Sequence, residues 1–154
     1  MEYLGQIIVG IVIAAVSSLL TVQLSLKRYR TEKWWEKRAE AYSNILGLLH
    51  DAKEFSEENM AADLAGRELT EQEDKNLRAR SSACTNDIYR AMDVGQFYLS
   101  PKAISRLKKY KKESSEAGNN GDWNSYLVQD FDAAESCLKD IINIAKSDLK
   151  VEDA

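Results

Sequence analysis

The sequence predicts an all-α protein in which a single N-terminal transmembrane helix continues into a cytoplasmic antiparallel four-helix bundle. Three observations lead to this fold class. Residues Leu4 to Leu26 contain no charged residue and no histidine, and the whole chain of 154 residues contains only one proline. Amphipathic segments with helical periodicity follow the apolar run almost to the C-terminus, and nothing has the alternation typical of strands.

The apolar run Leu4 to Leu26 is expected to span a membrane. At about 1.5 Å of rise per residue, a helix of this length crosses a hydrocarbon core of about 30 Å. A cleaved signal peptide would need a positive start and a shorter apolar core, but the chain begins Met1-Glu2-Tyr3. A buried helix of a soluble domain would be apolar on one stripe, whereas Ile7 to Ile13 is apolar on all sides.

The residues that flank the run set the expected orientation. No Lys or Arg precedes it, and basic residues dominate the segment directly after it. The positive-inside rule therefore places the N-terminus outside and the C-terminal part in the cytoplasm, in the cell inner membrane. Cys84 and Cys137 would then lie in a reducing compartment, so no disulfide is expected. Four aromatic residues are expected to anchor the ends of the span at the interface: Tyr3, Tyr29, Trp34 and Trp35.

Small residues within the span suggest a packing face. They recur four residues apart, so they lie on one side of the helix and let a second helix approach closely. A polar side chain lies above them and could form hydrogen bonds across the interface. This pattern predicts a homo-oligomer, although small residues are also common in membrane helices that do not associate. The predicted face consists of Gln6, Gly10, Ala14 and Ser18.

The first bundle helix is expected to continue from the span without a break and to end near Asn59. Its apolar residues recur at spacings of three and four, at Ala41, Tyr42, Ile45, Leu48, Leu49, Ala52 and Phe55. The chain is accordingly expected to comprise an anchor with a basic flank (1–30), a cytoplasmic helical bundle (31–150) and an acidic tail (151–154).

Each of the other three helices has a recognisable start. Thr70 and Glu73 form a capping box, Ser100 precedes Pro101 at the first helical position, and Asp122 can cap the last helix. Gly66, Gly95 and Gly118 are the expected breakers. The inward faces are predicted at Leu77, Ser81, Cys84, Ile88, Ala91, Met92 and Gly95 in one helix and at Leu127, Phe131, Ala134, Leu138, Ile141, Ala145 and Leu149 in the last.

The sequence contains few features of an enzyme. It has no Gly-rich phosphate loop, no nucleophile elbow and no His/Cys cluster that could bind a metal. His50 is the only histidine, so it lacks partners for a triad or a His-based metal site. Cys84 and Cys137 fall on or beside apolar stripes and are expected to be buried. No catalytic residue, metal or cofactor is therefore expected.

A basic segment with nearby aromatic residues predicts a site for an anionic ligand. Lysines would bind phosphates, rings would stack on bases, and asparagine amides could read base edges. The basic residues also have simpler explanations: interaction with the helix dipole, with anionic lipids, with an acidic partner, or with the chain's own acidic stretch Asp51 to Asp74. The predicted ligand-binding residues are Lys102, Arg106, Lys108, Lys109, Lys111, Lys112, Asn119, Asn120, Trp123 and Tyr126.

In its layout the chain resembles small bacterial membrane effectors of phage defence, among them the cyclic-oligoadenylate-responsive membrane proteins of type III CRISPR systems. The matching parts are the span Leu4 to Leu26, the basic segment Lys102 to Lys112 and the aromatic stretch Asn119 to Tyr126. The resemblance implies a cytoplasmic sensor for a cyclic oligonucleotide. It is one of layout and carries no individual residue role.

Two functions follow from these observations. The first is a membrane-anchored, oligomerising sensor or effector whose cytoplasmic domain binds an anionic ligand, such as a cyclic oligonucleotide, and transmits this event to the membrane, for example in antiviral defence. The second is a non-enzymatic scaffold or accessory subunit that docks a cytoplasmic protein. An exposed apolar patch around Phe97, Tyr98 and Leu99 would favour the scaffold.

Overall fold

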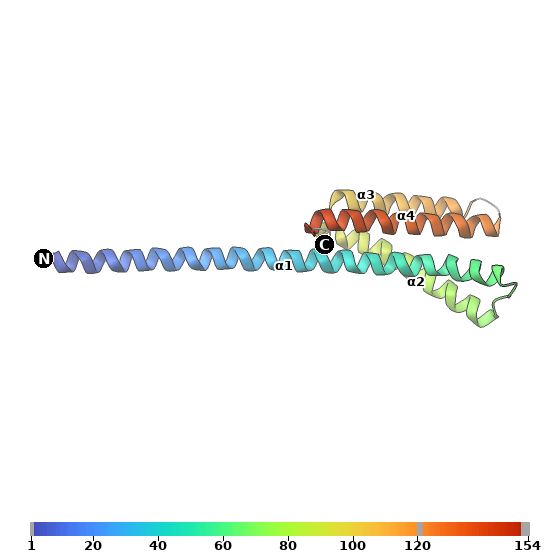
Figure 1. Ribbon diagram of the computed structural model, residues 1–154, viewed down its shortest axis with the longest axis horizontal. Helices are drawn as coiled ribbons and strands as arrows, with labels where there is room; N and C mark the ends of the chain where they lie inside the picture. The colour runs from blue at the N-terminus through green and yellow to red at the C-terminus, as the bar shows by residue number, and fades with distance from the viewer. Residues whose placement is uncertain (1, 120–121, 152–154) are drawn as a thin grey trace. The chain divides into compact units, whose positions relative to one another are not determined.

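The computed structural model describes residues 2–119 and 122–151, with side chains from residue 16 onward. Within these residues it contains four α-helices, the short 3-10 helix η1 and no strand (Figure 1). The helices are α1 (Glu2–Leu64), α2 (Glu71–Val94), α3 (Pro101–Ala117) and α4 (Trp123–Leu149), and η1 is Gly95–Phe97. The prediction of an all-helical chain is confirmed. The chain forms two compact units, Met1–Lys37 and Arg38–Ala154.

The second unit is the predicted four-helix bundle. The part of α1 from residue 38 onward packs with α2, α3 and α4, and successive helices run in opposite directions (Figure 1). Each helix contributes large apolar side chains to the main core. The largest that are almost completely buried there include Tyr42, Ile45, Leu49, Ile88, Leu107 and Ile141, and Leu127 packs with Phe55 and Leu77 in a second, smaller cluster. The inward faces predicted for α2 and α4 are buried or half-buried.

Polar side chains also join the helices of the bundle. The buried carboxylate of Asp130 on α4 accepts hydrogen bonds from Ser56 on α1 at 2.9 Å and from Ser114 on α3 at 2.8 Å. At the other end, the hydroxyl of Tyr42 on α1 donates to Asp148 on α4. Because buried polar groups are costly unless hydrogen-bonded, these contacts favour one relative placement of α1, α3 and α4.

The helix starts lie where the capping residues predict them. Thr70 accepts a hydrogen bond from the Glu73 amide while the Glu73 carboxylate binds the Thr70 amide. The side chains of Ser100 and Asp122 each accept a hydrogen bond from the backbone amide three residues later, at the starts of α3 and α4. The predicted end of the first bundle helix was too early, since α1 continues past Asn59 to Leu64. Ala62 in this extra turn is buried, so its packing favours continuation.

Replacing Thr70 with alanine is expected to lower the free energy of unfolding by about 1 kcal/mol, because the amides at the start of α2 lose their side-chain acceptor. Urea unfolding of the full chain measures this change. Gln72→Ala is the control, since Gln72 is exposed in the same turn and bonds only Asn76. Equal effects of the two substitutions would contradict a capping role for Thr70.

Part of the predicted membrane segment can be assessed in the structure. The segment Leu4 to Leu26 begins in residues 4–15, whose side chains lie outside the described part of the chain. Among the residues that are described, no helix is long and apolar enough to cross a membrane. The acidic tail is described only at Val151, which is exposed.

Candidate functional site

The predicted basic face of α3 is only partly free to bind an anion. Lys109 and Lys112 are largely exposed but pair with acids one turn later, at 3.4 Å from Glu113 and 3.5 Å from Glu116. The Lys111 ammonium lies 4.1 Å from the centre of the Tyr89 ring on α2. Lys102 and Lys108 are exposed. These lysines lie along a solvated helix face, and each exposed pair contributes little energy.

Arg106 does not belong to that exposed face. It is buried, and its guanidinium donates to Asp140 at 2.6 Å and to Ser136 at 3.1 Å on α4, and to Glu113 at 3.0 Å on α3. Through these three groups Arg106 joins α3 to α4, so it does not lie with the exposed lysines of the predicted ligand-binding set.

The acidic stretch Asp51 to Asp74 does not neutralise the basic segment in the described part of the chain. Its carboxylates pair instead with nearby basic residues from α1, α2 and their connection. Exposed pairs of this kind hold side-chain orientation more than they stabilise the fold. The pairs are Glu54 with Arg80, Glu57 with Lys53, Glu73 with Arg67 and Asp74 with Arg78.

Two of the predicted aromatic residues line a groove of about 470 Å³, which we call the Trp123 groove. Trp123 stacks on Tyr126 with ring centres 5.4 Å apart, and Phe55 meets Trp123 edge-on at 6.5 Å. Trp123 remains 46% exposed, so part of its indole faces solvent. Three helices and the turn before α4 contribute to the lining: Phe55, Arg78, Gly118, Asp122, Trp123 and Tyr126.

One cation and one anion lie in the Trp123 groove. The guanidinium carbon of Arg78 lies 5.5 Å from the centre of the Trp123 ring, a cation–π arrangement. Arg78 also donates through Nε to Asp74, which raises the pKa of Arg78. Hydrogen bonds from Ser125 lower the pKa of Asp122. Burial raises the pKa of Tyr126, so its hydroxyl stays protonated at neutral pH.

The remaining predicted residues are two asparagines of the ligand-binding set and the packing face of the span. Asn119 is exposed, and its amide donates to the carbonyl of Ser115 at 3.4 Å. Asn120 lies outside the described residues. On the predicted packing face of the span, the side chains of Gln6, Gly10 and Ala14 also lie outside them, while Ser18 is exposed.

Phe55 and Arg78 were missed as site residues by sequence reasoning. Phe55 was assigned to the core stripe of α1, and it is buried there with one edge turned to Trp123. Arg78 lies one residue after Leu77, an inward position of α2. The position of Arg78 next to a core residue was the available signal in the sequence. That signal does not reveal which helix packs against this part of α2.

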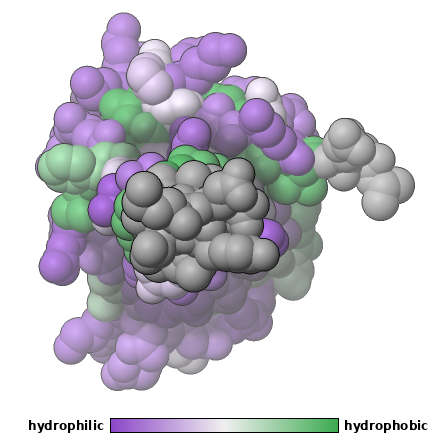
Figure 2. All heavy atoms as spheres, turned by 90° about the vertical axis from the view of Figure 1, so that its left-hand side faces the viewer, coloured by the Kyte–Doolittle hydropathy of each residue, from purple (hydrophilic) through white to green (hydrophobic). Residues whose placement is uncertain are grey.

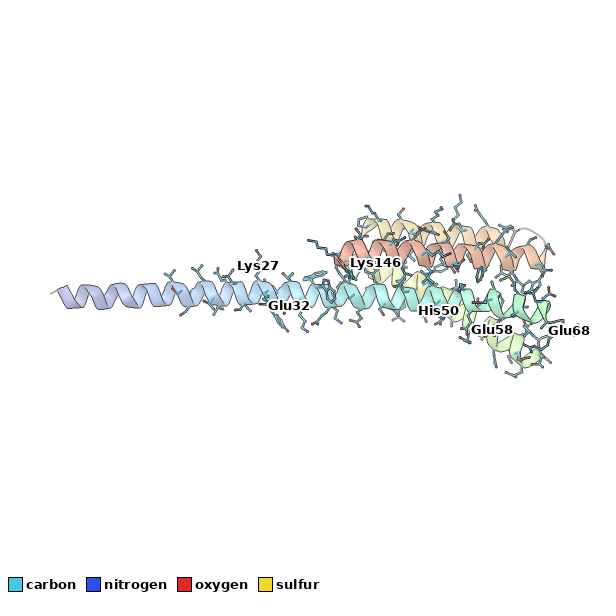
Figure 3. All side chains as sticks on the ribbon, viewed as in Figure 1. Lys27, Glu32, His50, Glu58, Glu68 and Lys146 are labelled. Atoms are coloured by element: carbon cyan, nitrogen blue, oxygen red, sulfur yellow. The ribbon has the colours of Figure 1, made fainter. Side chains whose placement is uncertain are left out.

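The histidine and the two cysteines do not line the Trp123 groove. His50 is exposed on α1 (Figure 3). Cys84 and Cys137 are buried and free, as their positions predicted, and the Cys84 thiol donates to the Leu48 carbonyl. Among the described residues no group of three or more His, Cys, Asp or Glu side chains could hold a metal ion.

The buried thiols predict a loss of stability at alkaline pH. Burial raises the pKa of Cys84 from 9.0 to about 11 and that of Cys137 to about 12. Between pH 9 and 11 the unfolded chain therefore binds fewer protons than the folded chain, so the free energy of unfolding falls as the pH rises. Urea unfolding at pH 7.5, 9.0 and 10.5 measures this, and a fall equally steep in Cys84→Ala/Cys137→Ala would contradict it.

On the face that lies to the left in Figure 1, most of the coloured side chains are hydrophilic, and the hydrophobic ones form smaller patches (Figure 2). No family model matches the chain, and no curated protein or solved structure matches it. The Trp123 groove is the candidate site in which predicted aromatic residues lie beside a basic side chain.

Proposed function

We propose that this protein is a membrane-anchored helical sensor that binds an anionic, ring-bearing ligand in the Trp123 groove. The anchor is the charge-free segment Leu4 to Leu26. In its described half, large apolar side chains are at least half exposed, and such a surface calls for a lipid or protein neighbour. These side chains are Val16, Leu19, Leu20, Val22, Leu24 and Leu26.

The observation that carries the ligand proposal is the partly exposed Trp123 ring beside the Arg78 guanidinium. Indole and phenol rings offer flat faces on which a nucleobase can stack. The Nη groups of Arg78 can donate to a phosphate, and such charge-assisted bonds are among the strong ones. The groove volume of about 470 Å³ lies within the range of small-molecule sites. A cyclic oligonucleotide combines both chemistries.

Isothermal titration of the full chain in detergent micelles with cyclic and linear oligoadenylates tests this proposal. Wild type is expected to give saturable heat, and Trp123→Ala and Arg78→Gln are expected to weaken binding by about tenfold or more. Arg80→Gln is the matched control, because Arg80 has a similarly exposed side chain on α2 and an ion pair of its own. Arg80→Gln is expected to bind like wild type.

Two results would overturn the ligand proposal. One is the absence of heat with every nucleotide in wild type. The other is equal binding by wild type, Trp123→Ala and Arg78→Gln. A third pattern, in which only removal of Lys108 and Lys112 weakens binding, would move the site to the basic face of α3.

A scaffold remains the second candidate, because one observation favours it. Phe97 is 79% exposed at the end of η1, and Val94 beside it is 58% exposed. The exposed patch is smaller than the predicted one, because Leu99 is buried and Tyr98 is half-buried. The Tyr98 carbonyl accepts a hydrogen bond from Arg38. Exposed aromatic side chains are frequent anchors of protein partners.

Pull-down from solubilised membranes separates the two candidates. A docked partner is expected to be captured by wild type and lost from Val94→Ser/Phe97→Ser. Leu64→Ser is the control, because Leu64 is an exposed apolar residue at the other end of the bundle. Equal capture by all three proteins would rule out docking through Val94 and Phe97.

A further inference from the structure

A second hollow lies on α1 within the first unit, where the apolar segment Leu4 to Leu26 ends. Its volume is about 480 Å³ and it follows one face of the helix. Residues spaced by three and four positions share a helix face, which explains why one helix alone provides the whole lining. The lining residues are Gln23, Leu26, Lys27, Arg30, Thr31 and Trp34.

The cations of this face have no acidic neighbour. Lys27 and Arg30 have no Asp or Glu three or four residues away on either side, and neither makes an ion pair within the described residues. The neighbouring cations differ. Arg28 pairs with Glu32 at 2.9 Å, and Lys33 pairs with Glu36 at 2.6 Å. Lys27 and Glu32 point to different sides of α1 (Figure 3).

The character of the same face changes along the helix. Towards the N-terminus the spacing continues through Val16, Leu19 and Leu20, which are 51%, 64% and 55% exposed. Lys27 follows Leu20 by about 10 Å along the axis. Trp34, an amphipathic residue that is common at membrane interfaces, ends the face and is 54% exposed. Along this face, apolar side chains therefore give way to two cations, and an amphipathic ring follows them.

We propose that this face binds the headgroup of an anionic phospholipid of the phosphatidylglycerol type. Lys27 Nζ and the Arg30 guanidinium donate to the phosphate oxygens, the Trp34 ring lies at headgroup level, and the acyl chains run beside Leu26 and the apolar residues before it. The occupant is a lipid of the surrounding bilayer, because only a molecule with both parts matches the apolar and cationic parts of the face. This inference rests on the proposed membrane anchor.

Native mass spectrometry of the full chain in detergent micelles tests the site. Dioleoylphosphatidylglycerol is added to one sample and dioleoylphosphatidylcholine to another, and the retained lipid adducts are compared. Wild type is expected to retain phosphatidylglycerol selectively. Lys27→Gln/Arg30→Gln is expected to reduce its affinity by about thirtyfold, the effect of two basic residues near an anionic surface. Arg28→Gln/Lys33→Gln removes the same charge and is expected to retain the lipid.

Equal loss of phosphatidylglycerol from the two double variants would overturn the site, because general charge would then explain the binding. Equal retention of both lipids by wild type, or competition by inorganic phosphate alone, would also overturn it. Fractionation distinguishes this failure from failure of the anchor. If the chain remains in the membrane fraction but retains both lipids equally, only the proposed lipid site is wrong. If the chain leaves the membrane fraction, the proposed anchor and the lipid site are both wrong.

Discussion

Arg106→Gln is expected to lower the free energy of unfolding of the full chain by about 2–3 kcal/mol. The substitution removes a buried guanidinium, so Asp140 and Ser136 lose their Arg106 donor and Glu113 keeps only its ion pair with Lys109. The expected loss is smaller than for a fully buried ion pair, because the side chains of Asp140 and Glu113 are 51% and 31% exposed and can regain water. Urea unfolding followed by circular dichroism measures the change.

The matched control is Lys108→Gln, which removes one charge from an exposed position of the same helix. It is expected to change stability by no more than about 0.5 kcal/mol. Arg106→Lys should recover only part of the loss, because an ammonium cannot reproduce the fork of guanidinium donors. If Arg106→Gln were as stable as Lys108→Gln, the structural role of Arg106 would be wrong.

Ile141→Ala is expected to lower the free energy of unfolding of the full chain by about 2–5 kcal/mol. Ile141 is completely buried in the core shared by the four helices, so the substitution removes apolar contacts and leaves a cavity. The control is the neighbouring residue, since Ile142 is 37% exposed on the same helix. Ile142→Ala is expected to cost about 1 kcal/mol or less. Similar losses at the two positions would contradict the orientation of α4.

The sequence was sufficient to predict the helices and most of the residues that form the core. Local signals determine where helices start, so Thr70, Ser100 and Asp122 were recognised from the chain alone. The end of α1 was harder to predict, because the helix continues to Leu64 and the chain turns only at Gly66, where φ is +60°. Packing of Ala62 rather than a local stop signal keeps residues 60–64 helical.

The candidate site was less predictable, because charge pairing between helices has no local signature. Arg106 was grouped with the lysines that follow it, although it also shares the spacing of Ala103, Leu107 and Tyr110, which are all buried. Its partner Asp140 lies on α4, and nothing near Arg106 in the sequence indicates it. In the same way, Arg78 meets Trp123 only because α2 and α4 pack in one bundle.

The central claim is that Leu4 to Leu26 anchors the chain while the bundle lies in the cytoplasm. Alkaline carbonate extraction of membranes from cells expressing the full chain, with a topology reporter fused after Ala154, tests it most directly. We expect the chain to stay in the pellet until detergent is added and the reporter to be active in the cytoplasm. Release of the intact chain by carbonate alone, or export of the reporter, would contradict the account.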